Sequence, residues 1–533
     1  MEVQELLKLY AAHPQVTALD TLLKNDTSRN IFLKGLNGSG PAMTIASLFT
    51  KGRGSYVCVL NDQEEAGYFY HDLMQLTASN EVYFFPSAYR RAIKYGHVDP
   101  ANEILRTEVL SRLQDPDASF VIVTYPDALA ERVVAREVLK ENTLKISVGE
   151  KLDNMFVSDV LDEYGFEQVD YVYEPGQYAL RGSILDVFSF SNEFPYRIDF
   201  FGDEVETIRT FDVETQLSKE KLDSIYIVPE MSKNAKDSTS LLGSLPRNTC
   251  IAARDLAWCK ERIGSVWNDD PVVADEESFA DIDQMRKKLV RGEDFLREVL
   301  DFRRIHFGAR PMGTADATIH FSTQTQPIYH KNFDRVSESF HKYLDEGYTL
   351  YILSDQEKQA NRIRMIFEDR GDNIPFTAVN RTIHEGFADD TLRICFFTDH
   401  QLFDRFHKFN LKSDKARSGK ITLSLKELNQ FSQGDYIVHI DHGVGQFGGL
   451  VRTEVNGKMQ EAIKLIYQNN DIIFVSIHSL HKLSKYKGKE SGEPPKLSKL
   501  GTGAWEKMKE RTKAKVKDIA RDLILLYSKR KQE

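Results

Sequence analysis

The first 145 residues alternate short apolar runs with amphipathic stretches. The apolar runs have the length of buried strands and lie at residues 31–34, 56–60, 82–86 and 120–125. Between them, apolar residues recur at helical spacing, as in Ile104–Leu113. Strands that alternate with helices in this way are typical of a parallel sheet covered by helices. The pattern therefore predicts the first part of an α/β domain over residues 1–145.

The pattern changes to shorter, alternating strands from residue 146. Three runs alternate apolar and polar positions and predict strands at Val169–Tyr173, Tyr178–Phe188 and Tyr196–Phe201. The pair Gly202-Asp203 is a hairpin signal, so a return strand is expected at Glu204–Arg209. We therefore expect a small antiparallel α+β insert over residues 146–228.

Helical and strand patterns mix again after the insert. The first α/β domain is expected to continue over 229–315, with a long charged helix around Phe279–Val299. A second, small α/β domain is expected over 316–405. Its strands and helices are predicted at residues 318–322, 332–346, 348–353, 356–370 and 392–397.

The last part of the chain is rich in β patterns and basic residues. A polar, basic linker at 406–426 precedes a series of strand-like runs over 427–487, joined by turn signals such as Asn456-Gly457. About sixty residues of this kind predict a small β-barrel. A linker at 488–502 then leads to a basic amphipathic helix over 503–533.

Composition narrows the class of protein. The chain has 533 residues, of which 41% are hydrophobic and 28% charged, as in globular proteins of several domains. Its four cysteines are scattered without a C-x-x-C pair, which indicates a reducing compartment and no structural zinc. No apolar run approaches the roughly 20 residues of a membrane span. The net charge of −10 argues against extensive wrapping of nucleic acid.

One glycine-rich loop follows the first predicted strand. Gly35, Gly38 and Gly40 allow backbone N–H groups to surround a phosphate at a helix N-terminus. The motif G-x-x-x-x-G-K-[ST] is matched at both glycine positions, but Pro41 replaces the phosphate-binding lysine and Ala42 the magnesium-binding hydroxyl. The loop is therefore either a degenerate nucleotide site or an ordinary glycine-rich turn.

Two further patterns suggest functional sites, and each also has an ordinary structural explanation. Arg181 and Gly182 lie between Tyr178 and Phe188 in a run expected to be an exposed strand, a combination that suits a protein-binding patch as well as an isolated rim arginine. Asp399-His400 follows an apolar strand, as in motifs that hold Mg²⁺. It is expected to be a solvent-facing strand end instead, because no phosphate-binding lysine accompanies it.

Four histidines near the predicted barrel invite a zinc interpretation. They form two H-x-x-H pairs, at His439 and His442 and at His478 and His481. Residues three apart on a strand point to opposite faces, so neither pair is well arranged to chelate a metal. We therefore expect no metal site.

The quoted stretches together resemble known proteins. Residues 33–46 (LKGLNGSGPAMTIA) are similar to the nucleotide loop of the excision-repair helicase UvrB, and residues 166–188 and 197–206 resemble the UvrB domain that binds UvrA. Residues 434–448 (GDYIVHIDHGVGQFG) resemble the polymerase-binding module of CarD-type regulators. Their order, with a small α/β domain between them, resembles the transcription-repair coupling factors over essentially the whole chain.

The resemblance implies a non-catalytic adaptor. It implies that the chain is the N-terminal half of a longer protein whose ATP- and Mg²⁺-dependent DNA translocase motor follows the tail helix. It also implies a helicase-like α/β domain with a degenerate P-loop, no cofactor in this chain, DNA contacts mainly through the absent motor, and a monomer in the bacterial cytoplasm without a membrane partner.

Residue roles follow from the resemblance position by position. Arg181 and Gly182 match the R-G motif through which UvrB contacts UvrA, Phe188 matches the phenylalanine that closes it, and Tyr178 starts the same stretch. Ala179 stands where UvrB has a second contacting arginine, so UvrA binding is expected to depend on fewer charges.

Binding to the β subunit of RNA polymerase is expected at one strand of the barrel. The family's contact edge corresponds to Leu450, Val451, Arg452, Thr453 and Glu454. The expected mode is strand addition, in which backbone hydrogen bonds extend a sheet.

Two other functions remain open from the sequence. The chain could be a nucleotide-dependent UvrB-like enzyme that binds phosphate through the backbone of Gly35–Gly40 alone. It could also be a CarD-like transcription regulator that binds promoter DNA through the tail helix, with the salt dependence of a phosphate contact.

Overall fold

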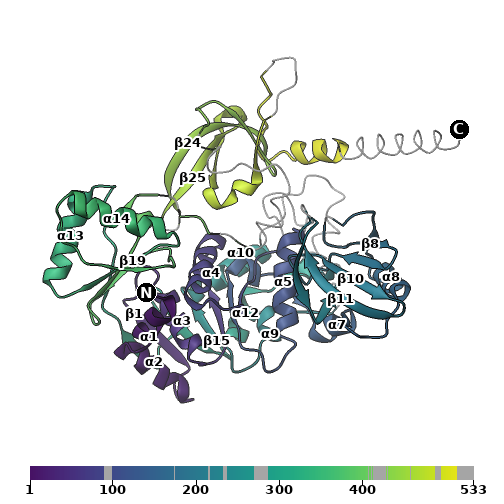
Figure 1. The fold of residues 1–533 in the computed structure, drawn as a ribbon, viewed down its shortest axis with the longest axis horizontal. Helices are drawn as coiled ribbons and strands as arrows, with labels where there is room; N and C mark the ends of the chain where they lie inside the picture. Colours follow the sequence, from purple (N-terminus) through teal and green to yellow (C-terminus); the bar gives the residue numbers. More distant parts are fainter. Residues whose placement is uncertain are drawn as a thin grey trace. The chain divides into compact units, whose positions relative to one another are not determined.

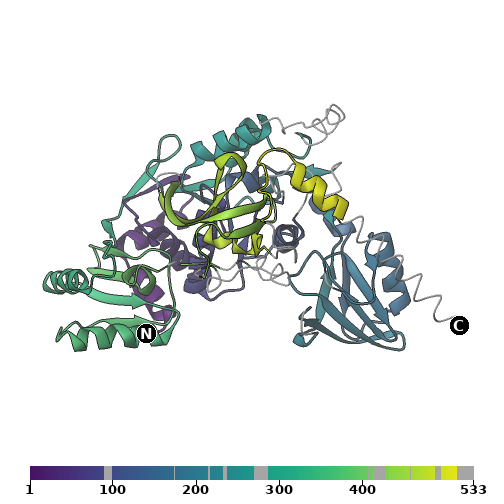
Figure 2. The same ribbon diagram turned by 90° about the horizontal axis from the view of Figure 1, so that it is seen from above.

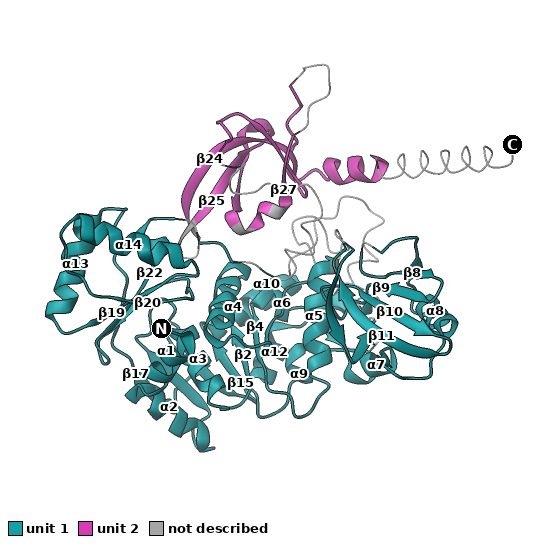
Figure 3. Cartoon of the chain, viewed as in Figure 1, with its two compact units in different colours: residues 1–89, 98–271, 277–416 teal, residues 90–97, 272–276, 417–533 magenta. Residues whose placement is uncertain are grey.

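The computed structural model describes residues 1–88, 99–172, 174–213, 216–231, 237–268, 286–405, 407–409, 411, 428, 430–455, 458–486 and 494–512. Two compact units make up the chain, residues 1–89, 98–271 and 277–416 in unit 1 and residues 90–97, 272–276 and 417–533 in unit 2 (Figure 3). Most of the expected linkers and the tail helix beyond residue 512 lie outside the described residues. No helix among the described residues is both long and apolar enough to cross a membrane.

The described residues of unit 1 contain the helices of both expected α/β domains and helix α8 of the insert. In chain order they are α1 (Val3–Ala11), α2 (Pro14–Lys24), α3 (Gly40–Thr50), α4 (Gln63–Thr77), α5 (Pro100–Arg112), α6 (Pro126–Leu129), α7 (Arg136–Glu141), α8 (Asn154–Glu163), α9 (Leu241–Ser244), α10 (Leu256–Asn268), α12 (Gly292–Val299), α13 (Phe333–Asp345), α14 (Glu357–Asp369) and α15 (Asp399–Leu402). Capping residues in the local sequence determine where several of these helices begin. Asp62 and Asn332 accept hydrogen bonds from the first turns of α4 and α13.

The main sheet of unit 1 is parallel throughout. Its strands lie in the order β17 (Ala317–His320), β1 (Asn30–Lys34), β16 (Arg303–His306), β15 (Cys250–Ala253), β2 (Tyr56–Val59), β4 (Val121–Thr124) and β3 (Val82–Phe84). Strands buried on both faces read as continuous apolar runs, which is why β2 and β4 were recognisable in the sequence. The four strands expected within residues 1–145 are all present, and β1 and β15 of this sheet are labelled in Figure 1.

The insert leaves and rejoins this domain through a pair of antiparallel strands. β6 (Leu144–Ser147) enters the insert and β13 (Ser224–Ile227) leaves it, with Ile146 opposite Ile225. A second antiparallel pair joins β5 (Val133–Val134), which precedes β6 in the chain, to β14 (Ser238–Thr239), which follows β13. The chain therefore enters and leaves the insert at adjacent points.

The insert itself is a six-stranded sheet with α8 packed on it (Figure 2). The order is β12 (Ser218–Leu222), β11 (Glu204–Phe211), β10 (Tyr196–Phe201), β9 (Ile184–Val187), β8 (Gln177–Arg181) and β7 (Glu167–Gln168). The expected hairpin at Gly202 is confirmed, with a left-handed φ of 62°. Residues from α8, from the hairpin strands and from β6 and β13 form one apolar cluster.

Two strand predictions in the insert were wrong. The run Tyr178–Phe188 is a hairpin rather than one strand, because Gly182 adopts a φ of 62° and β8 turns back into β9. The run Val169–Tyr173 is not a strand over its described residues, and only Glu167–Gln168 pairs with β8. Alternation of apolar residues continues through the Gly182 turn, so the pattern alone did not reveal it.

The second α/β domain is built on a five-stranded sheet. Its order is β18 (Thr323–Thr325), β21 (Phe387–Asp389), β22 (Ile394–Thr398), β19 (Thr349–Leu353) and β20 (Thr377–Val379), and α13 and α14 pack on it. The strand expected at 318–322 exists as β17, but it pairs with β1 in the main sheet. The chain therefore passes directly from β17 in the main sheet to β18 in the sheet of the second α/β domain.

The long helix expected around Phe279–Val299 was also wrong. Residues 269–285 lie outside the described residues, and Leu289 forms a β-bridge with Glu131 instead of a helical turn. The helix α12 begins only at Gly292, and it packs against α10 and α9.

Unit 2 contains a five-stranded antiparallel sheet. Its order is β26 (Ile472–Ser476), β25 (Lys458–Ile466), β24 (Gly443–Val455), β23 (Tyr436–His439) and β27 (Leu483–Lys485), with the short helices η3 (Gln468–Asn470) and η4 (Ile477–Lys482) between strands. β26 and β27 end the order and are joined through η4. The expected barrel is thus an open sheet in the described residues, folded over a core that includes Ile437, Phe447 and Tyr467.

Candidate functional site

The glycine-rich loop forms the strand-turn-helix that its sequence predicts. Gly35 has a φ of 90° and Gly38 a φ of 54°, conformations that favour glycine. A Cβ atom on Gly35 would collide with the backbone of Phe321. Pro41 sits in the first turn of α3, where its missing N–H costs no helical hydrogen bond, and Ala42 is buried within the same helix.

Two N–H groups of this loop donate to other parts of unit 1. The N–H of Asn37 donates to Oγ1 of Thr323 and that of Ser39 to the carbonyl oxygen of Glu385, each over 3.0 Å. Oγ of Ser39 in turn accepts from the N–H of Glu385 and donates to Oδ2 of Asp72. The loop therefore packs against Phe321, Thr323 and Glu385 of the second α/β domain.

Arg181 ends β8 beside the Gly182 turn. Its Nη2 donates to Oδ2 of Asp186 over 2.6 Å and its Nη1 to the carbonyl oxygen of Asp170 over 2.8 Å. The guanidinium lies 5.0 Å from the ring centroid of Tyr171. Asp186 is buried and also accepts two hydrogen bonds from Arg197. Arg181 is therefore held in one orientation while 35% of its side chain stays exposed.

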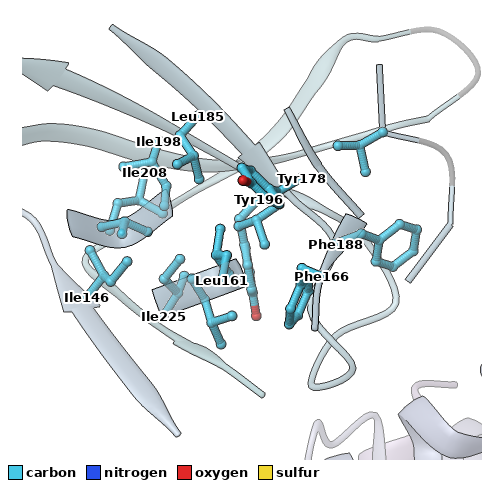
Figure 4. Packing of buried hydrophobic residues seen from close by; sticks show 14 of the residues in the cluster. Ile146, Leu161, Phe166, Tyr178, Leu185, Phe188, Tyr196, Ile198, Ile208 and Ile225 are labelled. Atoms are coloured by element: carbon cyan, nitrogen blue, oxygen red, sulfur yellow. The ribbon is translucent and has the colours of Figure 1, made fainter. Parts of the chain in front are cut away.

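Tyr178 and Phe188 do not form an exposed patch with Arg181, contrary to the sequence expectation. Both side chains belong to the apolar cluster of the insert and are 1% and 3% exposed (Figure 4). The hydroxyl of Tyr178 donates to Oδ1 of Asp162 in α8 over 2.7 Å. These two residues support the β8–β9 hairpin from inside, and neither is available for direct contact with a partner.

Exposed apolar side chains that the sequence did not single out surround the same turn. Phe201 is 78% exposed, and Met155 and Phe156 at the start of α8 are 56% and 52% exposed. Backbone and side-chain hydrogen bonds join their segments, from Asn154 Nδ2 to the Gly182 carbonyl and from the Phe200 N–H to the Ser183 carbonyl. We call Met155, Phe156, Tyr171, Arg181 and Phe201 the Gly182 surface.

The alternation of buried positions along β10 indicates that Phe201 is exposed. Tyr196, Ile198 and Phe200 point into the core of the insert, so Phe201 must point the other way. In α8 the core positions are Val157 and Leu161, four residues apart, which leaves Met155 and Phe156 off the buried face. Exposed aromatic residues beside an arginine are the composition of protein-binding surfaces.

The residues expected to bind RNA polymerase lie on β24, the longest strand of unit 2. β23 pairs with β24 only at Gly443–Gln446, whereas β25 pairs with it as far as Val455. Within the described part of unit 2, one edge of β24 is thus without a neighbouring strand over Leu450–Val455. An edge of this kind can accept an added strand.

The side chains on this edge differ in exposure. Leu450 packs against the core, and Val451 and Thr453 are half-buried. Arg452 is exposed, with its Nε 3.3 Å from Oε1 of Glu461 on β25. The side chain of Glu454 lies outside the described residues.

The Asp399-His400 pair differs from its expected environment, and His439 of the predicted H-x-x-H pairs is buried. Asp399 and His400 are buried, and Asp399 accepts from Arg405 over 2.5 Å, so the solvent-facing strand end was wrong. His439 is buried, which lowers its pKa to about 3, and its Nδ1 accepts from the N–H of Asp441. The side chains of His478 and His481 lie outside the described residues.

Comparison with known proteins identifies two domains. Residues 144–232 match the UvrB interaction domain, a range that starts with β6 and includes the insert and the Gly182 surface. Residues 431–487 match the CarD-like/TRCF RID domain, which covers the sheet of unit 2.

Curated proteins that match nearly the whole chain are transcription-repair-coupling factors. A transcription-repair-coupling factor of Bacillus subtilis is 25% identical over 93% of this chain and 48% of its own length. One of Staphylococcus aureus is 25% identical over 97% of this chain and 51% of its own length. The chain therefore spans about half the length of the curated relatives it matches. The chain is thus similar to the N-terminal part of the transcription-repair-coupling factors over nearly its whole length, and it matches the UvrB interaction domain and the CarD-like/TRCF RID domain in two separate segments.

Proposed function

We propose that this chain is an adaptor for transcription-coupled DNA repair, which recruits UvrA through residues 144–232 and binds the β subunit of RNA polymerase through residues 431–487. The observation that carries the proposal is the presence of both matched domains in one chain. They belong to different compact units, so each can bind its partner through its own surface.

The UvrA contact is assigned to the Gly182 surface. Arg181 supplies an oriented guanidinium, because Asp186 and the Asp170 carbonyl fix its direction. Phe201, Phe156 and Met155 supply apolar area that burial in an interface would stabilise. Tyr178 and Phe188 act indirectly, by holding the hairpin that presents Arg181.

The polymerase contact is assigned to the edge of β24 over Leu450–Val455. Strand addition needs a backbone edge that is not already paired, and the described part of unit 2 provides it there. Exposed Arg452 and half-buried Thr453 are proposed to set specificity on this edge, together with Glu454 at the next position, with Leu450 and Val451 as the apolar part.

We further propose that the glycine-rich loop has a structural role and does not bind nucleotide in this chain. Its donors at Asn37 and Ser39 are satisfied by Thr323 and Glu385, and its closest approach is to the backbone of Phe321. A nucleotide would have to displace these contacts without the help of a lysine or a magnesium-binding hydroxyl, which the sequence lacks at Pro41 and Ala42.

Paired pull-downs test the proposal. The chain is immobilised and exposed separately to purified UvrA and to purified RNA polymerase β subunit. Retention of both supports the adaptor. Retention of neither, together with salt-dependent binding to promoter DNA, would instead favour a CarD-like regulator. Micromolar binding of ATP would favour the nucleotide-dependent enzyme.

A further inference from the structure

Three histidines from separate segments of unit 1 meet beside α4. His384 lies in the loop between β20 and β21, His400 in α15, and His407 follows that helix. One ring nitrogen from each lies within 4.8 Å of the others. Nδ1 of His384 and Nδ1 of His407 are 3.3 Å apart. Zinc–nitrogen bonds of about 2.0–2.1 Å place two ligand nitrogens roughly 3.3 Å apart in a tetrahedral site. The spacing of this pair therefore suits a shared ion.

The surrounding structure fixes the positions of two of these rings. Tyr68 of α4 stacks on His384 with ring centroids 3.4 Å apart, and its hydroxyl donates to the carbonyl oxygen of His407. The N–H of His384 donates to Oδ1 of Asp72 over 2.7 Å. The ring of Phe409 lies directly over Gly67, where any side chain would collide with it. α4 thus holds both the 384 loop and the segment of His407.

The third ring has a defined tautomer. Nε2 of His400 lies 2.8 Å from the carbonyl oxygen of His384, which can only accept, so Nε2 carries the hydrogen and Nδ1 keeps the lone pair. The rings of His400 and His407 are stacked with centroids 4.1 Å apart, and one of them must turn about its Cβ–Cγ bond before both can direct lone pairs at one ion.

A fourth nitrogen is close to this cluster. The ring of His71, also on α4, lies 5.3 Å from that of His407. Within the described part of the chain, its buried Nδ1 has no hydrogen-bond partner. A buried polar atom without a partner is costly unless another group satisfies it. An ion held by the three histidines, or a water on that ion, would satisfy it.

We propose that His384, His400 and His407 bind one divalent transition-metal ion of the zinc class. Neutral imidazoles without a thiolate or an oxygen ligand suit zinc, cobalt, nickel and copper rather than magnesium or calcium. The ion ties the 384 loop to the segment that follows α15, on the surface of α4. The nearest described link to the glycine-rich loop is Glu385, which accepts from Ser39.

Metal analysis of the untagged chain tests this site, since a polyhistidine tag would bind the same ions. The chain is stripped with a chelator, dialysed against zinc and measured by atomic emission. We expect about one zinc ion per chain. The matched variants His384→Phe and His407→Phe keep a ring for the stacks with Tyr68 and His400 but remove the nitrogens, so bound zinc should fall to the background of the measurement.

Two controls separate metal loss from misfolding. His320→Ala removes an exposed histidine on β17 and should leave the zinc content unchanged. In the wild type, cobalt should give the intense visible absorption of a tetrahedral nitrogen site, a result that needs no variant. Equal zinc content in the wild type and the His384→Phe/His407→Phe double variant would overturn the proposal, as would a wild type that binds no zinc and shows no such cobalt spectrum.

Discussion

Nη2 of Arg181 donates to Oδ2 of Asp186 over 2.6 Å, and Asp186 is the buried partner of this pair. Arg197 donates to both oxygens of the same carboxylate from the neighbouring strand β10. The carboxylate therefore keeps a cationic partner if Arg181 is removed. This arrangement allows the binding role of Arg181 to be separated from the stability of the insert.

Replacing Arg181 by alanine should weaken UvrA binding with little loss of stability. If Arg181 is a central contact, the loss is about 2 kcal/mol or more, roughly 30-fold in Kd, measured by surface plasmon resonance. The melting temperature should change little, because an ion pair that is one-third exposed on the arginine side contributes about 0–1 kcal/mol. Arg247→Ala, at an 81% exposed arginine outside the insert, is the matched control. An unchanged Kd for Arg181→Ala would remove this residue from the interface.

Arg197→Ala tests the same carboxylate from its buried side. Arg197 is 13% exposed, so its removal leaves Asp186 with only the more exposed Arg181. We expect the insert to lose about 3 kcal/mol or more of stability, seen as a lower thermal midpoint. A midpoint equal to that of Arg181→Ala would contradict the assigned difference between the two arginines.

Phe201→Ser should reduce UvrA binding without unfolding the insert. The side chain is 78% exposed, so the folded state loses little buried area. An aromatic residue buried in an interface is expected to contribute about 1–2 kcal/mol or more to binding. Leu217→Ser provides the control, because Leu217 is 68% exposed on the same insert but outside the Gly182 surface. Equal losses of binding in both variants would mean that general hydrophobicity, not this surface, is responsible.

Leu450→Arg combined with Thr453→Arg should abolish polymerase binding and leave UvrA binding intact. The two changes place charge on the edge of β24 where a strand would be added. Leu450 also packs against the core of unit 2, so Thr453→Arg alone is measured beside the double variant. We expect the single variant to bind polymerase more weakly while keeping the wild-type circular dichroism spectrum. Wild-type polymerase binding by the folded double variant would exclude this edge.

A pair of glycine variants tests the structural role of the glycine-rich loop. Gly35→Ala and Gly52→Ala both place a Cβ at a left-handed φ, of 90° and 73°. Only at Gly35 does the new atom collide, with the backbone of Phe321, whereas nothing lies within 4 Å at Gly52. We expect Gly52→Ala to cost about 1 kcal/mol and Gly35→Ala several times as much, measured by thermal unfolding. Similar midpoints would show that the loop does not depend on its contact with the second α/β domain.

The sequence predicted the layered α/β architecture because buried parallel strands and amphipathic helices have distinct periods. β1, β2, β4, α13 and α14 all appear within a few residues of their expected bounds. It did not predict the turn at Gly182, since Leu180 and Ile184 are four residues apart and continue the apolar alternation across the turn. Nor did it predict that β17 joins β1, because sheet partnership between distant strands leaves no local signal.

The candidate surfaces were predictable only in part. Arg181 could be singled out from its motif, but the burial of Tyr178 and Phe188 depends on how the hairpin faces α8. The exposure of Phe201 could have been predicted from the alternation of β10, because Tyr196, Ile198 and Phe200 occupy the buried face and Phe201 falls on the other one. The histidines at 384, 400 and 407 are brought together by a loop, a short helix and the segment after it, so no spacing in the sequence reveals the cluster.

The most direct test of the adaptor proposal is a bridging experiment. RNA polymerase β subunit is immobilised, and retention of UvrA is measured with and without this chain. The account predicts that UvrA is retained only when the chain is present, and that Arg181→Ala or the Leu450→Arg/Thr453→Arg variant each abolishes retention by breaking a different arm. If UvrA and the β subunit each bind the chain but never together, or if both variants still support bridging, the adaptor account is contradicted.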